Sequence, residues 1–219
     1  ALDALTTADG NTAVGVNAGS AVTTGASNTA IGQNALLVNT TGTMNAVLGN
    51  HALDANTTGS YNVAIGGNAL TANTTAADNV AIGYSSMAAN TTGTDNVAMG
   101  AYALDANTTG SDNTAIGDNA LGANSYASNN TAVGSSALLV NTSGAGNTAM
   151  GYLSMDASNG DYNSAFGYGT LGANTTGGEN TSIGNSVLAA NTTGAQNTGI
   201  GASSLGSNTT ASNNVAVGY

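Results

Sequence analysis

Short apolar runs recur along the whole chain at a fixed spacing. The motif Asn-x-Ala-aliphatic-Gly begins at Asn11 and returns every 17 residues up to Asn214, with one step of 16 between Asn147 and Asn163. A fixed period of this length predicts a repeat architecture in which each unit folds in the same way. Numbered from this Asn, the consensus unit is N-[TV]-A-[IV]-G-x-x-A-L-x-A-N-T-T-G-x-x.

Each unit contains two apolar runs that are too short for helices. Gly and Asn bound these runs, and both residues tolerate the positive φ angles found at corners. We therefore expect each unit to form one coil of two strands and two turns. Stacked coils pair strand on identical strand, so residues 1–219 are predicted to form one all-β array, a parallel β-solenoid or β-roll of about thirteen coils.

Stacking places equivalent residues in ladders along the axis. Position four gives an aliphatic ladder, position nine a mostly Leu ladder, and positions one and twelve give Asn ladders whose amides can pair between coils. We predict structural roles for these residues and the following Gly, represented by Asn62, Ile65, Gly66, Leu70, Asn96, Met99, Leu104, Asn107, Asn113, Ile116 and Leu121.

The first strand is apolar on both of its faces. Positions two and four (Thr or Val, then Ile or Val) point one way, and positions three and five (Ala, then Gly) point the other way. Strands of this kind are usually buried on both sides. We expect one face to line the coil interior and the other to pack on further copies of the chain, in a homotrimer around a shared axis.

One unit is shorter than the others, and both ends of the chain fall within a unit. Ser158-Asn159 replaces the usual Asn-Thr-Thr, which removes one residue at a turn, and we expect the strands to keep their phase. Solenoid ends usually carry a polar cap against edge pairing, and neither end has one. A fragment of a longer fibre is therefore expected.

The composition excludes several classes of partner. The chain has no Lys, Arg, Cys, Pro or Trp, and 11 acidic residues give it a net charge of −11. Without cationic side chains it cannot release counterions from nucleic acid, and anionic lipid headgroups would repel it. No apolar run approaches the length that spans a bilayer. The lack of Cys leaves the redox compartment undecided.

The titratable residues do not form a recognisable catalytic set. His51 is the only His, at the variable seventh position, and is interpreted as a surface residue. Asp3, Asp54, Asp105 and Asp156 recur every three coils, which separates them by about 14 Å, too far for a shared metal within one chain. Three copies of one Asp could bind Ca²⁺ across a trimer, but a solvated edge is the favoured interpretation. We therefore predict that the chain has no catalytic residue, no cofactor and no metal site, and that it is not an enzyme.

Three residue types suggest surface roles that we weigh against structural ones. Glycosylation acceptor triplets coincide with the repeated turn, so a structural role is favoured for their Asn residues. The Thr-Thr pair is expected to present at most one rank outward, because neighbouring strand residues face opposite sides. Tyr at position six should point outward, where it could stack on a sugar. The acceptor Asn residues are Asn39, Asn56, Asn73, Asn90, Asn107, Asn141, Asn174, Asn191 and Asn208, and the Tyr residues are Tyr84, Tyr152, Tyr168 and Tyr219.

The core motif, as in Asn62-Val63-Ala64-Ile65-Gly66, resembles the head repeats of YadA-like trimeric autotransporter adhesins. The longer form with Asn-Thr-Thr-Gly is also similar to repeat regions of phage tail-fibre proteins. The resemblance covers essentially the whole chain and implies a trimeric, left-handed parallel β-roll. This chain departs from the adhesin pattern by its longer unit.

The resulting functional hypothesis is a structural segment of an extracellular trimeric fibre, on a virion tail or a cell surface, that supports attachment to a host receptor or glycan. A monomeric ice-binding or other surface-binding solenoid is the alternative. A third hypothesis, a depolymerase acting on capsular sugar, would require paired carboxylates in a groove, and the repeats offer none.

Overall fold

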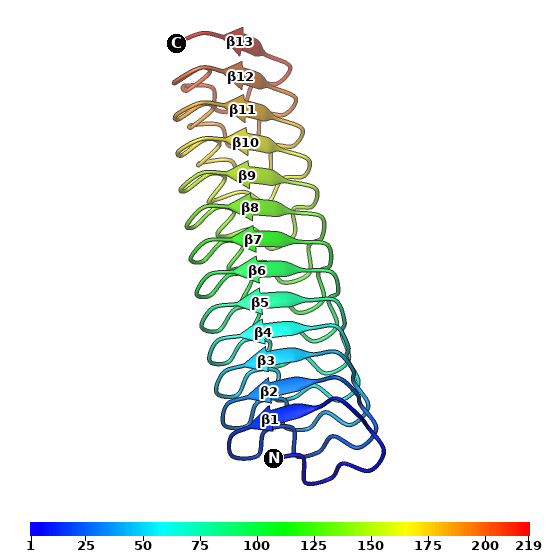
Figure 1. Ribbon diagram of the computed structural model, residues 1–219. Coiled ribbons are helices and arrows are strands. Elements are labelled where there is room, and N and C mark those ends of the chain that lie inside the picture. Colours follow the sequence, from blue (N-terminus) through cyan, green and yellow to red (C-terminus); the bar gives the residue numbers. More distant parts are fainter.

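The computed structural model describes all residues from 1 to 219 as one rod of stacked coils (Figure 1). Each coil contributes one three-residue strand, at positions two to four, and the strands form one parallel sheet in chain order. No segment forms a helix with the length and apolar character needed to cross a bilayer. The strands are β1 (Thr12–Val14), β2 (Thr29–Ile31), β3 (Ala46–Leu48), β4 (Val63–Ile65), β5 (Val80–Ile82), β6 (Val97–Met99), β7 (Thr114–Ile116), β8 (Thr131–Val133), β9 (Thr148–Met150), β10 (Ser164–Phe166), β11 (Thr181–Ile183), β12 (Thr198–Ile200) and β13 (Val215–Val217).

The predicted solenoid and its register are confirmed. Strand residues pair with their equivalents one unit further on, as Val63 does with Val80. The short unit does not disturb this pairing, because Thr148 of β9 pairs with Ser164 of β10 across only 16 residues. The missing residue is therefore absorbed in the turn around Ser158, and the strands stay in phase as expected.

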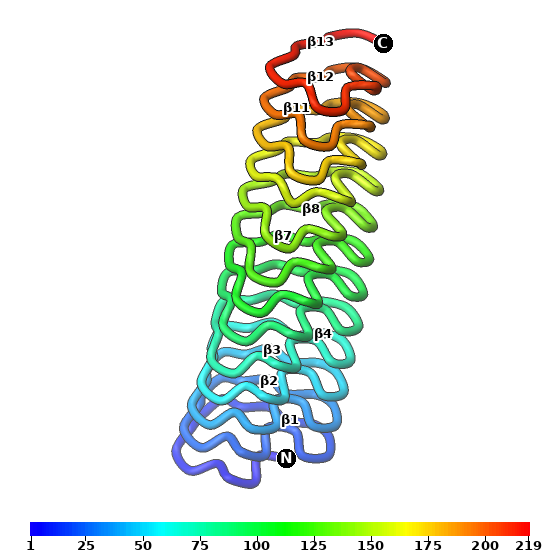
Figure 2. Tube along the Cα trace, turned by 180° about the vertical axis from the view of Figure 1, so that it is seen from behind, coloured from blue at the N-terminus to red at the C-terminus, as the bar shows by residue number.

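The prediction of a second strand in each coil is wrong. In the second half of the coil, seen from behind in Figure 2, positions seven and nine adopt left-handed backbone, with φ of 58° at Asn68 and 54° at Leu70. The coils still bond to each other there: the Leu70 amide donates to the Ser86 carbonyl of the next coil at 3.0 Å, and the Asn68 amide to the Asn50 carbonyl of the preceding coil at 3.0 Å. Alternating backbone handedness thus replaces the extended strand.

Leu in left-handed backbone is unusual, and its burial explains why the fold retains it. This conformation costs a non-glycine residue roughly 1–2 kcal/mol. Burying a Leu side chain contributes about 1.5–3 kcal/mol. Leu70, Leu104 and Leu121 are all fully buried, so the apolar gain exceeds the backbone cost.

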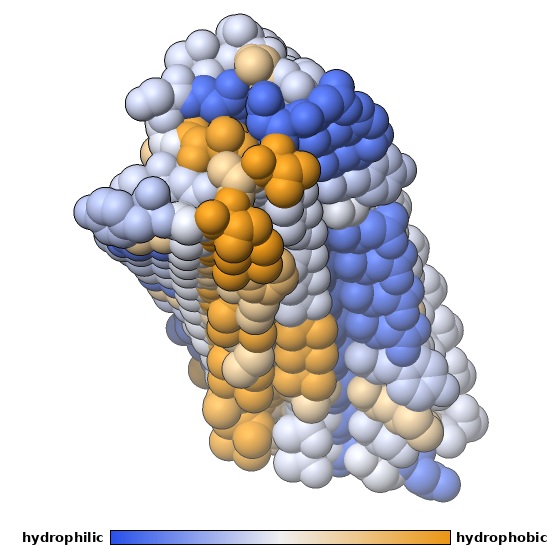
Figure 3. Space-filling view, turned by 90° about the horizontal axis from the view of Figure 1, so that it is seen from above, coloured by the Kyte–Doolittle hydropathy of each residue, from blue (hydrophilic) through white to orange (hydrophobic).

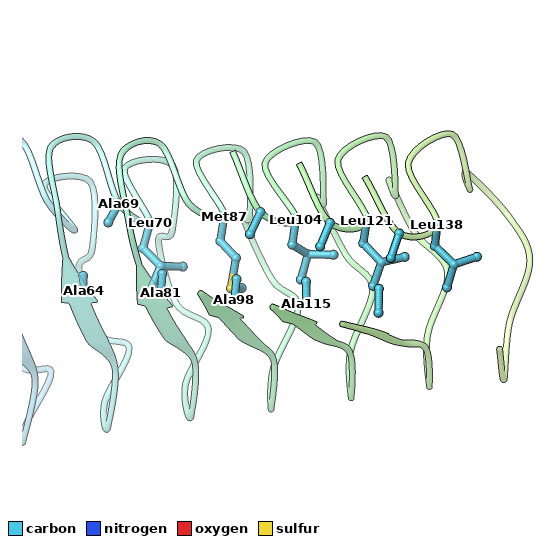
Figure 4. Close-up of a cluster of buried hydrophobic side chains, with 14 of the residues drawn as sticks. Ala64, Ala69, Leu70, Ala81, Met87, Ala98, Leu104, Ala115, Leu121 and Leu138 are labelled. Atoms are coloured by element: carbon cyan, nitrogen blue, oxygen red, sulfur yellow. The ribbon is translucent and has the colours of Figure 1, made fainter. Parts of the chain in front are cut away.

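The core is a single column of small and medium apolar side chains (Figure 4). Ala at positions three and eight and Leu or Met at position nine fill the coil, as Ala98, Ala103 and Leu104 do. A coil of this size has room for one large side chain, so the strand turns its Ala inward. The aliphatic side chain at position four consequently points outward.

The two Asn ladders close each coil through hydrogen bonds within the coil and between coils. Asn45 at position one and Asn56 at position twelve both donate from Nδ2 to the carbonyl of Gly59, at 3.0 and 2.9 Å. Each amide also bonds to its equivalent in the preceding coil, as Asn56 Nδ2 does to Asn39 Oδ1 at 2.9 Å. No buried side-chain nitrogen or oxygen lacks a partner, so the polar interior is fully satisfied.

Replacing Asn107 with Ala is expected to destabilise the rod by about 3 kcal/mol or more, because several buried partners lose a hydrogen bond. Asn107 Nδ2 donates to Asn90 Oδ1 and to the Gly110 carbonyl, each at 2.9 Å, and Asn124 donates to its Oδ1 at 3.0 Å. Thermal unfolding should show a melting temperature lower by about 10 °C. Asn50→Ala is the matched control, because Asn50 is exposed; an equal loss in both variants would contradict the role of the ladder.

Candidate functional site

The outward aliphatic ladder is the most extensive apolar feature of the surface. Ten of its thirteen members are exposed, from 37% for Ile65 to 75% for Val217, and the other three are half-buried. Figure 3 shows a column of apolar residues running down the side of the rod. The ladder consists of Val14, Ile31, Leu48, Ile65, Ile82, Met99, Ile116, Val133, Met150, Phe166, Ile183, Ile200 and Val217.

No charged side chain interrupts this face. Position two, on the same side of each strand, holds only Thr, Val, Ala or Ser. The acidic residues lie elsewhere: at position ten, at the turn of positions sixteen and seventeen, and once at position six. The residues at position ten are Asp3, Asp54, Asp105 and Asp156; those at the turn are Asp9, Asp78, Asp95, Asp112, Asp161 and Glu179; and the one at position six is Asp118. The sheet face is therefore a neutral stripe with an acidic turn, at positions sixteen and seventeen, along one side.

The size of the stripe decides how it should be interpreted. Thirteen strands at about 4.8 Å give a length of roughly 58 Å, and three residues per strand give a width of about 10 Å. The product, roughly 600 Å², is at the upper limit for the largest apolar patch on an ordinary monomer. It approaches the roughly 800 Å² that each partner contributes to a typical stable interface. The stripe is the surface best suited to association.

His51 lies in a short polar network that the sequence did not reveal. Its Nδ1 lies 2.9 Å from Asp54 Oδ2, and its Nε2 lies 3.2 Å from the amide nitrogen of Asn34. Thr71 of the next coil donates to Asp54 Oδ1 at 2.8 Å. The network thus ties three successive coils together at their surface. Both ring nitrogens of His51 thus have partners within this bridge between coils.

Asp105 and Asp156, two of the recurring carboxylates, lie half-buried at position ten. Burial raises the pKa of both carboxyl groups, partly offset by bonds from backbone amides. The folded state therefore binds a proton more readily than the unfolded chain. Its stability falls as pH rises from the ordinary Asp pKa through the raised one, and recovers on acidification.

The melting temperature is accordingly expected to rise by a small amount as pH is lowered from 7 towards 4. Protonation removes the cost of burying these two charges and relieves repulsion among the other carboxylates. The double variant Asp105→Asn/Asp156→Asn should melt higher than the original chain at pH 7 and respond less to pH. A pH series of calorimetric scans on both proteins tests this; an identical pH response in the two would contradict it.

The Asn residues of the glycosylation triplets are interior residues. All nine belong to the Asn ladder at position twelve, and eight of them are fully buried, with only Asn208 in the last full coil partly exposed. Their amides are engaged by neighbouring coils, as in the bond from Asn191 Nδ2 to Asn174 Oδ1 at 3.0 Å. These Asn side chains therefore belong to the hydrogen-bonded interior of the rod.

The expectation that Thr-Thr presents only one rank outward is wrong. In several coils both residues are exposed, as Thr74 with Thr75 and Thr108 with Thr109 are. The pair lies in a turn and not in a strand, so the alternation of faces does not apply. The two hydroxyls differ in their bonding, because the first Thr donates to the next coil, as Thr57 Oγ1 does to the Thr74 carbonyl at 3.0 Å.

The four Tyr residues at position six point outward as predicted, with Tyr84 at 53% and Tyr168 at 54% exposure. Two of the four lie on consecutive coils: the ring centroids of Tyr152 and Tyr168 are 5.8 Å apart. Tyr84 instead meets Tyr102 of the next coil edge to face at 5.6 Å. The sequence alone did not indicate these aromatic contacts between coils.

No pocket opens on the rod, and no three His, Asp or Glu side chains lie close enough together to hold a metal ion. The surface thus offers an extended face and no concave site. No protein-family model matches the chain, and neither a characterised protein nor a solved structure gives a significant match to it.

Proposed function

We propose that the chain is a structural segment of an extracellular trimeric fibre, of the kind that phage tail fibres and bacterial adhesins use for attachment to a host or a surface. The observation that carries this proposal is the neutral aliphatic stripe along one face of a straight rod. Water contact along such a stripe is unfavourable by about 25 cal/mol per Å². Association of copies along their lengths removes it.

A symmetric trimer suits this surface for a geometric reason. Around a threefold axis each stripe faces the stripes of both other copies, and equivalent coils meet at the same height. The acidic residues outside the sheet face stay in contact with water, which keeps the assembled rods soluble. Three solenoids bound along their length form a stiffer shaft than one, as a spacer between a particle and its target requires.

A second candidate function, ice binding by a single chain, is favoured by one observation. The second Thr of the pair is exposed in six consecutive coils, from Thr24 to Thr109, and in some of these coils the first Thr, such as Thr74, is exposed as well. A regular hydroxyl and methyl array of this kind is suited to ordering water. Measurement of thermal hysteresis separates the two functions: a monomer that shapes ice crystals would refute the fibre.

Disulfide trapping tests the proposed assembly, because the chain contains no Cys of its own. In the trimer, Ile116→Cys places three thiols around the axis, so mild oxidation at micromolar concentration should yield covalent dimers, with the third chain left unpaired. Thr109→Cys, at an exposed turn position outside the sheet, is the matched control and should remain largely monomeric on a non-reducing gel. Equal and low cross-linking in both variants would refute the proposal.

A further inference from the structure

Aromatic side chains concentrate in one part of the rod. Four of the nine aromatic residues, Tyr152, Tyr162, Phe166 and Tyr168, fall within residues 152–168. This is also where the unit loses a residue, at the turn holding Ser158. A local departure from an otherwise strict repeat indicates a structural or functional requirement that the repeat alone does not fulfil.

Tyr152 and Tyr168 form a shelf on the surface. Their rings are inclined by only 31°, and both are about half exposed, at 51% and 54%. The Tyr84 and Tyr102 rings, by contrast, cross at 78° and offer no common plane. The two rings, tilted by 31° and in contact on successive coils, give one ligand two neighbouring aromatic surfaces for its apolar faces.

Polar groups flank this shelf along the same row. Position six of the two preceding coils holds Asp118 and Ser135, and that of the following coil holds Asn185. Asp118 and Asn185 are exposed. Asp118 accepts one bond, from its neighbour Asn119 at 3.0 Å, which leaves acceptor capacity on the carboxylate. The row thus has hydrogen-bonding groups on both sides of the aromatic pair.

We propose that this row, from Asp118 through Tyr152 and Tyr168 to Asn185, binds an extended neutral oligosaccharide lying along the rod axis. Pyranose rings have apolar C–H faces for the two Tyr rings and hydroxyl edges for the flanking carboxylate and amide. The rise of one coil is comparable with the length of one pyranose residue in an extended chain. The site deepens the proposed function, on which it rests, by naming the chemistry of attachment.

The surroundings argue against other ligands. The chain has no Lys or Arg to pair with an acidic sugar or a phosphate. Strand addition by a peptide requires a free strand edge, whereas each of β2 to β12 is paired on both sides. A peptide helix requires a groove, and no pocket opens on this surface. An exposed aromatic pair, with no pocket around it, suits a long neutral polymer.

Titration with cellohexaose, chitohexaose and maltohexaose tests the site, with Tyr fluorescence as the readout because the chain has no Trp. At least one of the three should bind saturably. Tyr168→Ala and Tyr152→Ala should each weaken that binding at least about tenfold, the effect of losing one stacking contact. Tyr152→Phe should bind within about twofold, because the ring is kept. Tyr84→Ala, at the same position on another coil, is the control and should bind like the original chain.

Two results would overturn the site: no saturable binding of any of the three sugars at about 1 mM, or equal binding by the Tyr152→Ala/Tyr168→Ala double variant with unchanged circular dichroism. The oligomeric mass is measured on the same samples. A trimer without sugar binding refutes only this site, whereas a monomer that binds sugar through Tyr168 refutes only the proposed assembly.

Discussion

Gly100→Ala is expected to cost at least about 4 kcal/mol of folding free energy. Gly100 has a φ of 140°, a region that side chains with a Cβ rarely adopt. An added Cβ would also lie 2.6 Å from the carbonyl carbon of Gly117 in the next coil. Because that carbonyl belongs to the backbone ladder, the clash cannot be relieved by rotating a side chain.

Urea unfolding followed by circular dichroism measures this loss, and Gly67→Ala provides the control. Gly67 lies at position six of its own coil, where a Cβ would make ordinary contacts with the Tyr84 ring, at 3.5 Å, and the Asn50 carbonyl oxygen, at 3.9 Å. The control should change stability by less than about 1 kcal/mol. If Gly100→Ala unfolded at the same urea concentration as Gly67→Ala, the close stacking of glycines at position five would be refuted.

Charges placed on the aliphatic ladder are expected to separate the chains without unfolding them. Met99→Asp/Ile116→Asp puts six carboxylates around the axis of a trimer, where burial and mutual repulsion each cost several kcal/mol. The dissociation constant should therefore rise by at least about a thousandfold. Because Met99 and Ile116 point out of the coil, at 40% and 38% exposure, each single rod keeps its own core.

Size-exclusion chromatography with light scattering gives the mass of this double variant, and circular dichroism checks its fold. Thr92→Asp/Thr109→Asp adds the same charge on adjacent coils at exposed turn positions, so it should remain associated. Dissociation of both variants would show that net charge, and not the aliphatic face, controls assembly. Association of both would refute the role of the ladder.

Most of the fold follows from the period of the sequence. Equivalent residues must stack when every coil has the same length, so the register and the Asn ladders at positions such as Asn62 and Asn107 could be predicted. The short unit was also predictable, because a turn can lose a residue while strands such as β9 and β10 stay paired.

The second half of the coil could not be predicted from residue preferences. Ala-Leu runs bounded by Gly and Asn match a short strand, whereas Leu104 and Tyr102 adopt φ of 54° and 55°. Neighbouring coils impose this backbone through shared hydrogen bonds, a contribution that no single unit contains. The incorrect prediction of a second strand also led us to expect that the two Thr of each pair point to opposite sides. It gave no indication of the contact between His51 and Asp54, because that contact requires a turn that brings positions seven and ten together.

The sequence left open which face of the first strand points into the coil, and the volume of the coil decides this. With Leu70 filling the interior, only small residues such as Ala64 fit opposite, so Ile65 must face outward. Strand alternation alone allows both arrangements. Knowing which face is outward turns a general expectation of association into a surface of named residues.

Sedimentation equilibrium of the unaltered chain over a range of concentrations is the most direct test of association through the aliphatic ladder. The predicted result is a single species with three times the 20.8 kDa mass of the chain, persisting to low micromolar concentration. A mass of 20.8 kDa at every concentration would contradict it, because the stripe from Val14 to Val217 would then remain in contact with water.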